Sequence, residues 1–234
     1  ALESVPLGVQ VRLAWPMLSD QVRAVRIEAA RLLAAVPVGE LAEDQRRLLD
    51  GAIAEYIDSQ MAMAERPEAW MSLGNIHAAQ GQLDEAVAAY REAMVLDPRF
   101  APAYINLADF YRQSGKETGA EQVLREGIAA YGDSGDLRHA LGLSLVRQER
   151  MAEALPELRQ AAKHSPDNAR YVYVYAVALN TAGQARAALM VLQGAHNAHP
   201  NDTDILSALV AFNRDAGNDK QAVHYAQKLK RFER

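Results

Sequence analysis

Three polar residues near the carboxyl end of the chain have a spacing that could bind a metal ion. His196, His199 and Asp202 offer two imidazoles and a carboxylate, which are common zinc ligands. They surround Pro200, which ends a helix because proline has no amide hydrogen. The H-E-x-x-H arrangement of zinc proteases is absent. We therefore interpret the group as an exposed helix end and expect no metal and no cofactor.

Other catalytic patterns are weaker still. The segment 142–146, GLSLV, lacks the second glycine of a nucleophile elbow. The sequence has no phosphate-binding glycine loop and no dinucleotide fingerprint. It also has no cysteine, which excludes disulfides, thiolate zinc sites and a nucleophilic thiol within this chain. These features predict that the chain is not an enzyme.

The dominant pattern is a repeat of 34 residues. One column of the repeat is always alanine, a second is leucine with one tyrosine, and a third is glycine with one glutamate. The columns are Ala86, Ala120, Ala154, Ala188 and Ala222; Leu73, Leu107, Leu141, Tyr175 and Leu209; and Gly81, Gly115, Glu149, Gly183 and Gly217. A period of this length indicates stacked supersecondary units that bury a shared core.

The first copy opens with Trp70, Leu73 and Gly74 and closes at Pro98. It resembles the tetratricopeptide repeat, which opens with W-x2-L-G-x2-Y. The resemblance implies an all-α, right-handed superhelical solenoid of helix-turn-helix repeats. The five predicted repeats are 67–100, 101–134, 135–168, 169–202 and 203–234.

The columns have physical reasons. Alanine is expected where the two helices of a repeat lie closest, and glycine where the turn between them needs a left-handed backbone. Glu149 in the glycine column predicts a different turn in the third repeat. The segment Tyr171–Tyr175 alternates like a strand, but the period places it in a helix, and we follow the period.

Residues 1–40 do not fit the period. Residues 9–18 are expected to end one helix, and residues 21–36 to form a second, with Ser19-Asp20 as its N-cap and Pro37 as its end. The segment 18–33 resembles the second helix of a HEAT repeat, so residues 1–40 are predicted to be a HEAT-like helical pair. Residues 41–66 are predicted to form a long bridging and capping helix.

In the tetratricopeptide family the first helices of the repeats line a concave groove that holds a peptide or partner protein. The resemblance assigns the groove to Met71, Asn75, Ile105, Asn106, Asp109, Arg112, His139, Leu143, Arg147, Tyr173, Val177, Asn180 and Arg214. Tyr173 and His139 could instead be packing residues. The arginines could form a basic stripe, but the aspartates of the same face favour a mixed, solvated surface.

Asn75 and Asn106 match two asparagines of the clamp with which one branch of the family holds a carboxylate. The basic positions of that clamp hold Met71, Asp136 and Ala140, so the clamp is not predicted. The asparagine pair suits a peptide backbone, because a carboxamide both donates and accepts hydrogen bonds. The alternative, that both side chains only solvate the inner face, stays open.

Composition narrows the partners. The net charge of −5 argues against nucleic acid, and no apolar run reaches the ~20 residues of a membrane helix. The leading hypothesis is a non-catalytic scaffold for a protein or peptide. Alternatives are a self-associating module, with a homodimer through the HEAT-like end, or an accessory module of a larger protein.

The start at Ala1, without Met, reads as a mature or excised fragment. Tails of this kind resemble those of bacterial multihaem cytochromes, which would imply the periplasm. The sequence otherwise leaves cytoplasm and periplasm open.

Overall fold

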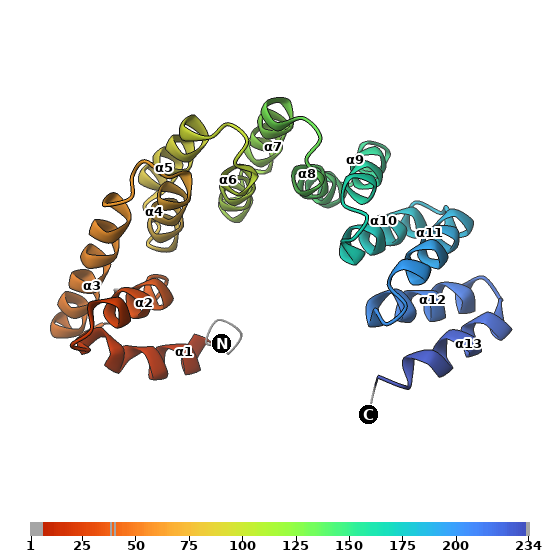
Figure 1. Ribbon diagram of the computed structural model, residues 1–234, viewed down its shortest axis with the longest axis horizontal. Coiled ribbons are helices and arrows are strands. Elements are labelled where there is room, and N and C mark those ends of the chain that lie inside the picture. The colour runs from red at the N-terminus through yellow and green to blue at the C-terminus, as the bar shows by residue number, and fades with distance from the viewer. Residues whose placement is uncertain (1–6, 38, 40, 233–234) are drawn as a thin grey trace. The chain divides into compact units, whose positions relative to one another are not determined.

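The computed structural model describes residues 7–37, 39 and 41–232, which form helices and connecting turns (Figure 1). The first elements are α1 (Leu7–Ala14), the 3-10 helix η2 (Trp15–Ser19), α2 (Arg23–Leu33) and α3 (Glu43–Met61). The helix pairs that follow are α4 (Pro67–Ala79) and α5 (Leu83–Leu96), α6 (Ala101–Gln113) and α7 (Glu117–Tyr131), α8 (Gly135–Arg147) and α9 (Met151–His164), α10 (Ala169–Thr181) and α11 (Ala185–Ala198), and α12 (Thr203–Asp215) and α13 (Asp219–Leu229). The all-α prediction is confirmed. No helix in these described ranges combines the length and apolarity needed to span a bilayer.

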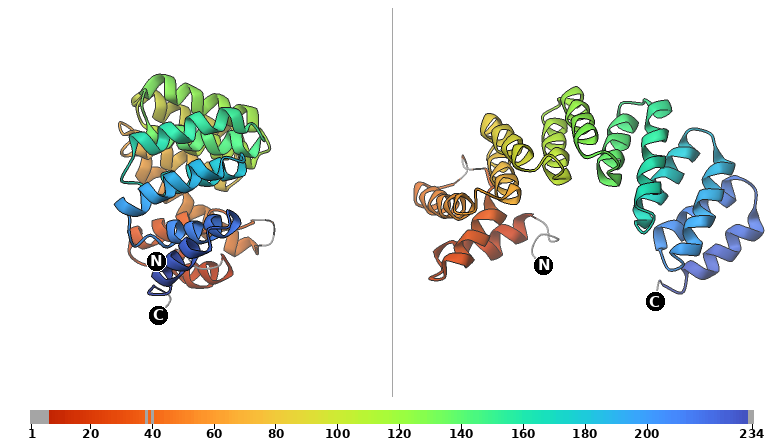
Figure 2. Two further views of the ribbon diagram at one scale, coloured as in Figure 1. Left: turned by 90° about the vertical axis from the view of Figure 1, so that its right-hand side faces the viewer. Right: turned by 45° about the horizontal axis from the view of Figure 1, so that its top comes forward.

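The chain divides within α6 into two compact units, Ala1–Phe110 and Tyr111–Arg234. In the first unit α2 packs on α3, α3 on α4 and α4 on α5. In the second unit α8 pairs with α9, α10 with α11 and α12 with α13, as Figure 2 shows for the last pair. Each predicted repeat thus contains two consecutive helices. The boundaries of the HEAT-like, bridging and repeat segments stay predictions.

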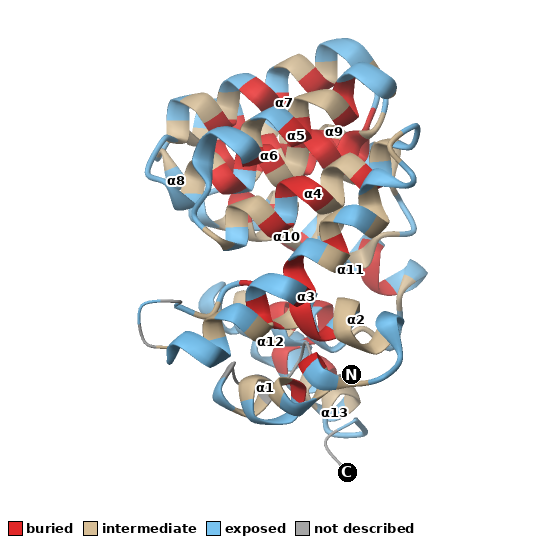
Figure 3. Cartoon of the chain, turned by 90° about the vertical axis from the view of Figure 1, so that its left-hand side faces the viewer, coloured by how far each residue is buried: buried red, intermediate tan, exposed pale blue. Residues whose placement is uncertain are grey.

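The repeated columns form the core of the helix pairs. All five alanines of the alanine column are buried, as are the four leucines of the leucine column. Along each helix, buried positions recur at intervals, whereas the turns are mostly exposed (Figure 3). A Cβ on Gly74 would lie 2.6 Å from the Tyr90 ring, and one on Gly142 would lie 2.6 Å from Leu158. A larger side chain at either position would displace these neighbours, so glycine fits the close helix packing.

The turns inside the repeats share one backbone conformation. Four glycines of the glycine column have φ between 71° and 77°, and Glu149 has φ 59°. Arg150 N donates to Leu145 O, and Gln184 N to Leu179 O in the next repeat, both at 2.9 Å. The prediction of a different turn at Glu149 is therefore wrong. The turn is kept because its hydrogen bonds are backbone bonds, and the glutamate adopts the left-handed conformation.

The tyrosine-rich segment Tyr171–Tyr175 lies inside α10, which confirms the assignment made from the period. Its side chains are half-buried between neighbouring helices. Packing between repeats therefore outweighs the local strand propensity, which is worth at most about 1 kcal/mol across the scale.

The amino-terminal helices are shorter than predicted. The first helix gives way at Trp15 to the 3-10 helix, which contains Pro16. The N-cap of α2 is Val22, whose side chain cannot cap. Asp20 instead accepts a hydrogen bond from Val22 N at 2.7 Å, so the N-cap prediction at Ser19-Asp20 is wrong by two residues. Residues 1–6 of the predicted HEAT-like unit lie outside the described residues.

A charge network joins α7 to the turn between α8 and α9. Glu121 accepts hydrogen bonds from Arg125 at 2.8 Å, from Arg150 at 2.6 Å and from Gln148 at 3.1 Å. Burial raises the pKa of the Glu121 carboxyl, but these three donors outweigh burial and lower the pKa to about 2. Gln148 and Arg150, which flank Glu149, thus bond this turn to α7 of the preceding repeat.

Candidate functional site

The first unit brings the two predicted asparagines together. Asn75 lies on α4 and Asn106 on α6, and Asn106 Nδ2 donates to Asn75 Oδ1 at 3.0 Å. The Tyr90 hydroxyl of α5 donates to the same oxygen at 2.7 Å. Both lone pairs of Asn75 Oδ1 are therefore used, which holds the Asn75 carboxamide in one orientation.

Tyr90 is the residue that sequence reasoning missed as part of this group. Its side chain is buried, and its ring lies in the space that glycine leaves at position 74. Burial, and to a lesser extent Asp109, raises the pKa of Tyr90 to about 12. The phenol therefore keeps its proton and acts as a donor to Asn75. The signal in the sequence is Gly74, whose missing side chain leaves room for a large residue on the following helix.

The two asparagines also carry side-chain polar atoms that these hydrogen bonds do not use. Asn75 is exposed and Asn106 half-buried. Among the interactions of the described residues, no partner is recorded for Asn75 Nδ2 or Asn106 Oδ1. The pair therefore offers a donor on one residue and an acceptor on the other, which matches the acceptor and donor of a peptide group. Met71 and Ile105 are half-buried and Asp109 is exposed on the same two helices.

In the second unit, His139 belongs to the packing between α8 and α10. Its ring stacks on Tyr171 with centroids 4.2 Å apart, and the Tyr171 hydroxyl donates to Asp136 at 2.6 Å. Burial, and secondly Arg170, lowers the pKa of His139 to about 4. The buried, neutral ring fits the packing role that the sequence left open.

The other predicted residues of the second unit are more accessible. Arg147 is exposed and bonds to Glu117 at 3.2 Å, so its charge is partly neutralised. Arg214 is exposed. The residues that are half-buried are Arg112, Leu143, Tyr173, Val177 and Asn180. They lie on α6, α8 and α10, the first helices of their repeats.

The two histidines and the aspartate considered as metal ligands make separate interactions in the structure. Asp202 caps α12 by accepting from Ile205 N at 2.9 Å. His199 Nε2 lies 3.3 Å from Pro166 O, and His196 is buried with its Nε2 2.9 Å from Lys228 Nζ. Within the described ranges, no three His, Asp or Glu side chains are arranged to hold a metal ion.

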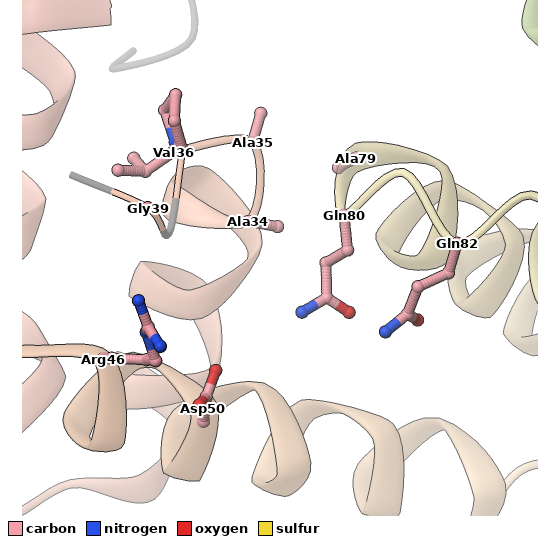
Figure 4. Close-up of a pocket in the computed structure, with 10 residues that line it drawn as sticks. Ala34, Ala35, Val36, Gly39, Arg46, Asp50, Ala79, Gln80 and Gln82 are labelled. Carbon is pink, nitrogen blue, oxygen red and sulfur yellow. The ribbon is translucent and has the colours of Figure 1, made fainter. Parts of the chain in front are cut away.

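A cavity of about 460 Å³ lies in the first unit between the end of α2, the start of α3 and the α4–α5 turn. Gln80 and Gln82 extend toward Arg46 and Asp50 across the opening (Figure 4). The lining contains one cation, one anion and two neutral carboxamides, so its formal charges cancel. The lining therefore favours no particular ion.

The match to known families covers most of the chain. The family model described as "Tetratricopeptide repeat" matches residues 26–198 and 102–233. It thus begins inside the segment that resembles a HEAT repeat, and the HEAT similarity stays a prediction. The solved structures include MamA, at 18% identity and a TM-score of 0.57 over 70% of this chain and 89% of that chain.

They also include YrrB, described as a tetratricopeptide protein with an unusual peptide-binding site, at 22% identity and a TM-score of 0.54 over 74% of this chain and 89% of that chain. Both show the fold. Among curated proteins, bimA of Emericella nidulans is 28% identical over 116 residues, which is 49% of this chain but 14% of that protein. The chain belongs to the tetratricopeptide repeat family, whose members are non-catalytic protein-interaction scaffolds.

Proposed function

We propose that the first unit binds an extended segment of a partner protein through the Asn75–Asn106 pair. The observation that carries the proposal is the hydrogen-bonded arrangement of the pair, in which Tyr90 and Asn106 both donate to Asn75 Oδ1. This leaves a donor on Asn75 and an acceptor on Asn106. A single peptide group can engage both, independently of its side chain.

Side chains of the bound segment would add specificity. Met71 and Ile105 supply half-buried apolar surface on the same helices, and burial of apolar surface favours association. The description of YrrB as having a peptide-binding site supports the class of ligand for the fold, and the residues proposed here rest on this chain alone.

The second unit carries a separate candidate surface. Tyr173, Val177 and Leu143 are half-buried on α8 and α10, and tyrosine is enriched at protein interfaces. We propose that this surface also contacts a partner, and Tyr173→Ala tests it independently of the asparagine pair.

The test is a selection of peptides from a displayed library on the wild-type chain, followed by measurement of their Kd. Asn75→Ala and Asn106→Ala should each weaken a selected peptide by about fivefold or more, because one hydrogen bond is worth about 1 kcal/mol. Asn197→Ala is the matched control, since Asn197 is exposed on α11. Equal affinity for all variants would refute the proposal for the asparagine pair.

Loss of peptide binding in the Tyr173→Ala variant alone would move the site to the second unit. Selection of no peptide, with association of the chain only with itself, would favour the self-associating alternative.

A further inference from the structure

A small cavity in the second unit is lined mainly by positively charged and polar side chains. Its volume is about 200 Å³, and its walls come from the end of α11, the following turn and the end of α13. The lining residues are His196, Pro200, Asn201, Lys228, Arg231 and Phe232. Whole small molecules usually occupy about 300 to 1,000 Å³, so this cavity fits a single functional group.

The cations of this cavity are not neutralised by the described part of the chain. Lys228 and Arg231 form no recorded ion pair with a carboxylate there. Asp202, the acidic residue closest in sequence to Asn201, uses its carboxylate to cap α12. Two positive charges therefore meet at one opening, although the whole chain carries a net charge of −5.

The ammonium of Lys228 is held in place from two sides. Its Nζ lies 2.9 Å from His196 Nε2 and 5.5 Å from the centre of the Tyr225 ring. An ammonium can only donate, so His196 Nε2 is the acceptor and the neutral ring carries its hydrogen on Nδ1. A positioned cation costs a ligand less ordering than a freely rotating lysine would.

His196 adds a second observation. Its side chain is 7% exposed, and its Nδ1 is buried with no hydrogen-bond partner among the described residues. Burial, then Lys228 and His224, lowers the pKa of His196, so the ring stays neutral beside the lysine. A buried donor without a partner is unusual and calls for a functional or structural reason.

We propose that this cavity binds a phosphate-sized oxyanion, held by Lys228 and Arg231 with Asn201 as an additional donor. Two cations without a carboxylate partner among the described residues match a doubly charged group, and the guanidinium fork of Arg231 fits two oxygens of one phosphate. The site lies on the second helices of the last two predicted repeats and on the turn that follows α11. It is therefore distinct from the residues of the proposed function, which lie on the first helices.

The test is an NMR titration of the full chain with inorganic phosphate at constant ionic strength, followed through the His196 ring and the Asn201 side chain. The expected result is saturable binding. The variant K228Q/R231Q should weaken it about tenfold or more, because two charge-assisted hydrogen bonds are lost. The matched control is K220Q/R186Q, which removes the same charge from exposed positions and should bind as the wild type does.

The single variant R231Q guards against misfolding, because Arg231 is exposed and lies beyond the end of α13. It should also weaken binding while leaving the circular dichroism spectrum unchanged. Equal weakening in K228Q/R231Q and K220Q/R186Q, or no saturation in the wild type, would overturn the proposal.

Two further ligands identify the source of the anion. Tighter binding of O-phosphoserine than of inorganic phosphate would support a phosphomonoester, and the reverse order would support free phosphate. Acetate should bind far more weakly than either. Binding of acetate as tight as that of phosphate would overturn the assignment to a doubly charged group.

Discussion

Replacing Glu149 by glycine should stabilise the second unit by about 1 kcal/mol. Glu149 is the described non-glycine residue with positive φ, at 59°, and the left-handed conformation costs an ordinary residue about 1 to 2 kcal/mol. Glycine removes that cost but adds about 0.4 to 1 kcal/mol of entropy to the unfolded chain. The difference is a net gain.

The Glu149 side chain itself should contribute little to this change in the free energy of unfolding. Glu149 is exposed, and no side-chain hydrogen bond or ion pair is recorded for it in the described part of the chain. Glu149 N donates to Val146 O and Arg150 N to Leu145 O, and the turn at Gly183 has the same two backbone bonds. The substitution therefore isolates the backbone conformation.

The assay is urea unfolding followed by circular dichroism, combined with hydrogen exchange of the Arg150 amide, which donates to Leu145 O. Hydrogen exchange reports the local turn, which matters because repeat proteins unfold in parts. The reverse variant Gly183→Glu should lose about the same free energy, and the double variant should return close to the wild type. A Glu149→Gly variant that is less stable than the wild type would show that the side chain, not the backbone, dominates this turn.

Three further predictions follow from packing and charge. Gly74→Ala should lower the free energy of unfolding by about 1 to 3 kcal/mol, because the new Cβ would lie 2.6 Å from the Tyr90 ring. Gly51→Ala has nothing within 4 Å of its new Cβ and should stabilise α3. Equal melting temperatures of the two variants would refute this prediction. Ala154→Leu should lower the free energy of unfolding by about 1 to 3 kcal/mol through overpacking, since Ala154 is fully buried. Ala152→Leu, on the exposed side of α9, should leave it nearly unchanged in the same unfolding assay. For Glu121 the folded pKa, about 2, lies below the ordinary value of 4.5, so the stabilisation by its ion pairs is present above pH 4.5 and is lost as the pH falls toward 2. Urea titrations across that range should show a steeper loss for the wild type than for Glu121→Gln, and parallel curves would contradict the ion-pair argument.

The fold could be predicted from the sequence because each repeat contacts mainly its neighbours. The same local packing problem then recurs every 34 residues, and the same residue types solve it. Buried alanines, and glycine against Tyr90, are direct consequences of helices that lie close together. The period even assigned Tyr171–Tyr175 to a helix against its local propensity.

The N-terminal helices were less predictable, because they occur outside the repeated pattern and were judged from local signals. Asp20 carries a typical capping side chain, but it bonds to Val22 N ahead of the helix. Glu149 lies inside the repeated pattern, but there too the local signal is misleading. Its identity suggested another turn, while the surrounding backbone hydrogen bonds impose the shared one.

The sequence by itself determined the repeat architecture and the class of interaction scaffold. Only the tertiary structure brought Asn106 and Tyr90 together at Asn75 Oδ1, buried His139 against Tyr171, and placed His196 beside Lys228. The reason is physical. Periodicity specifies which positions of neighbouring helices pack together, but hydrogen bonds between side chains depend on distances and orientations that are set only when the helices have packed.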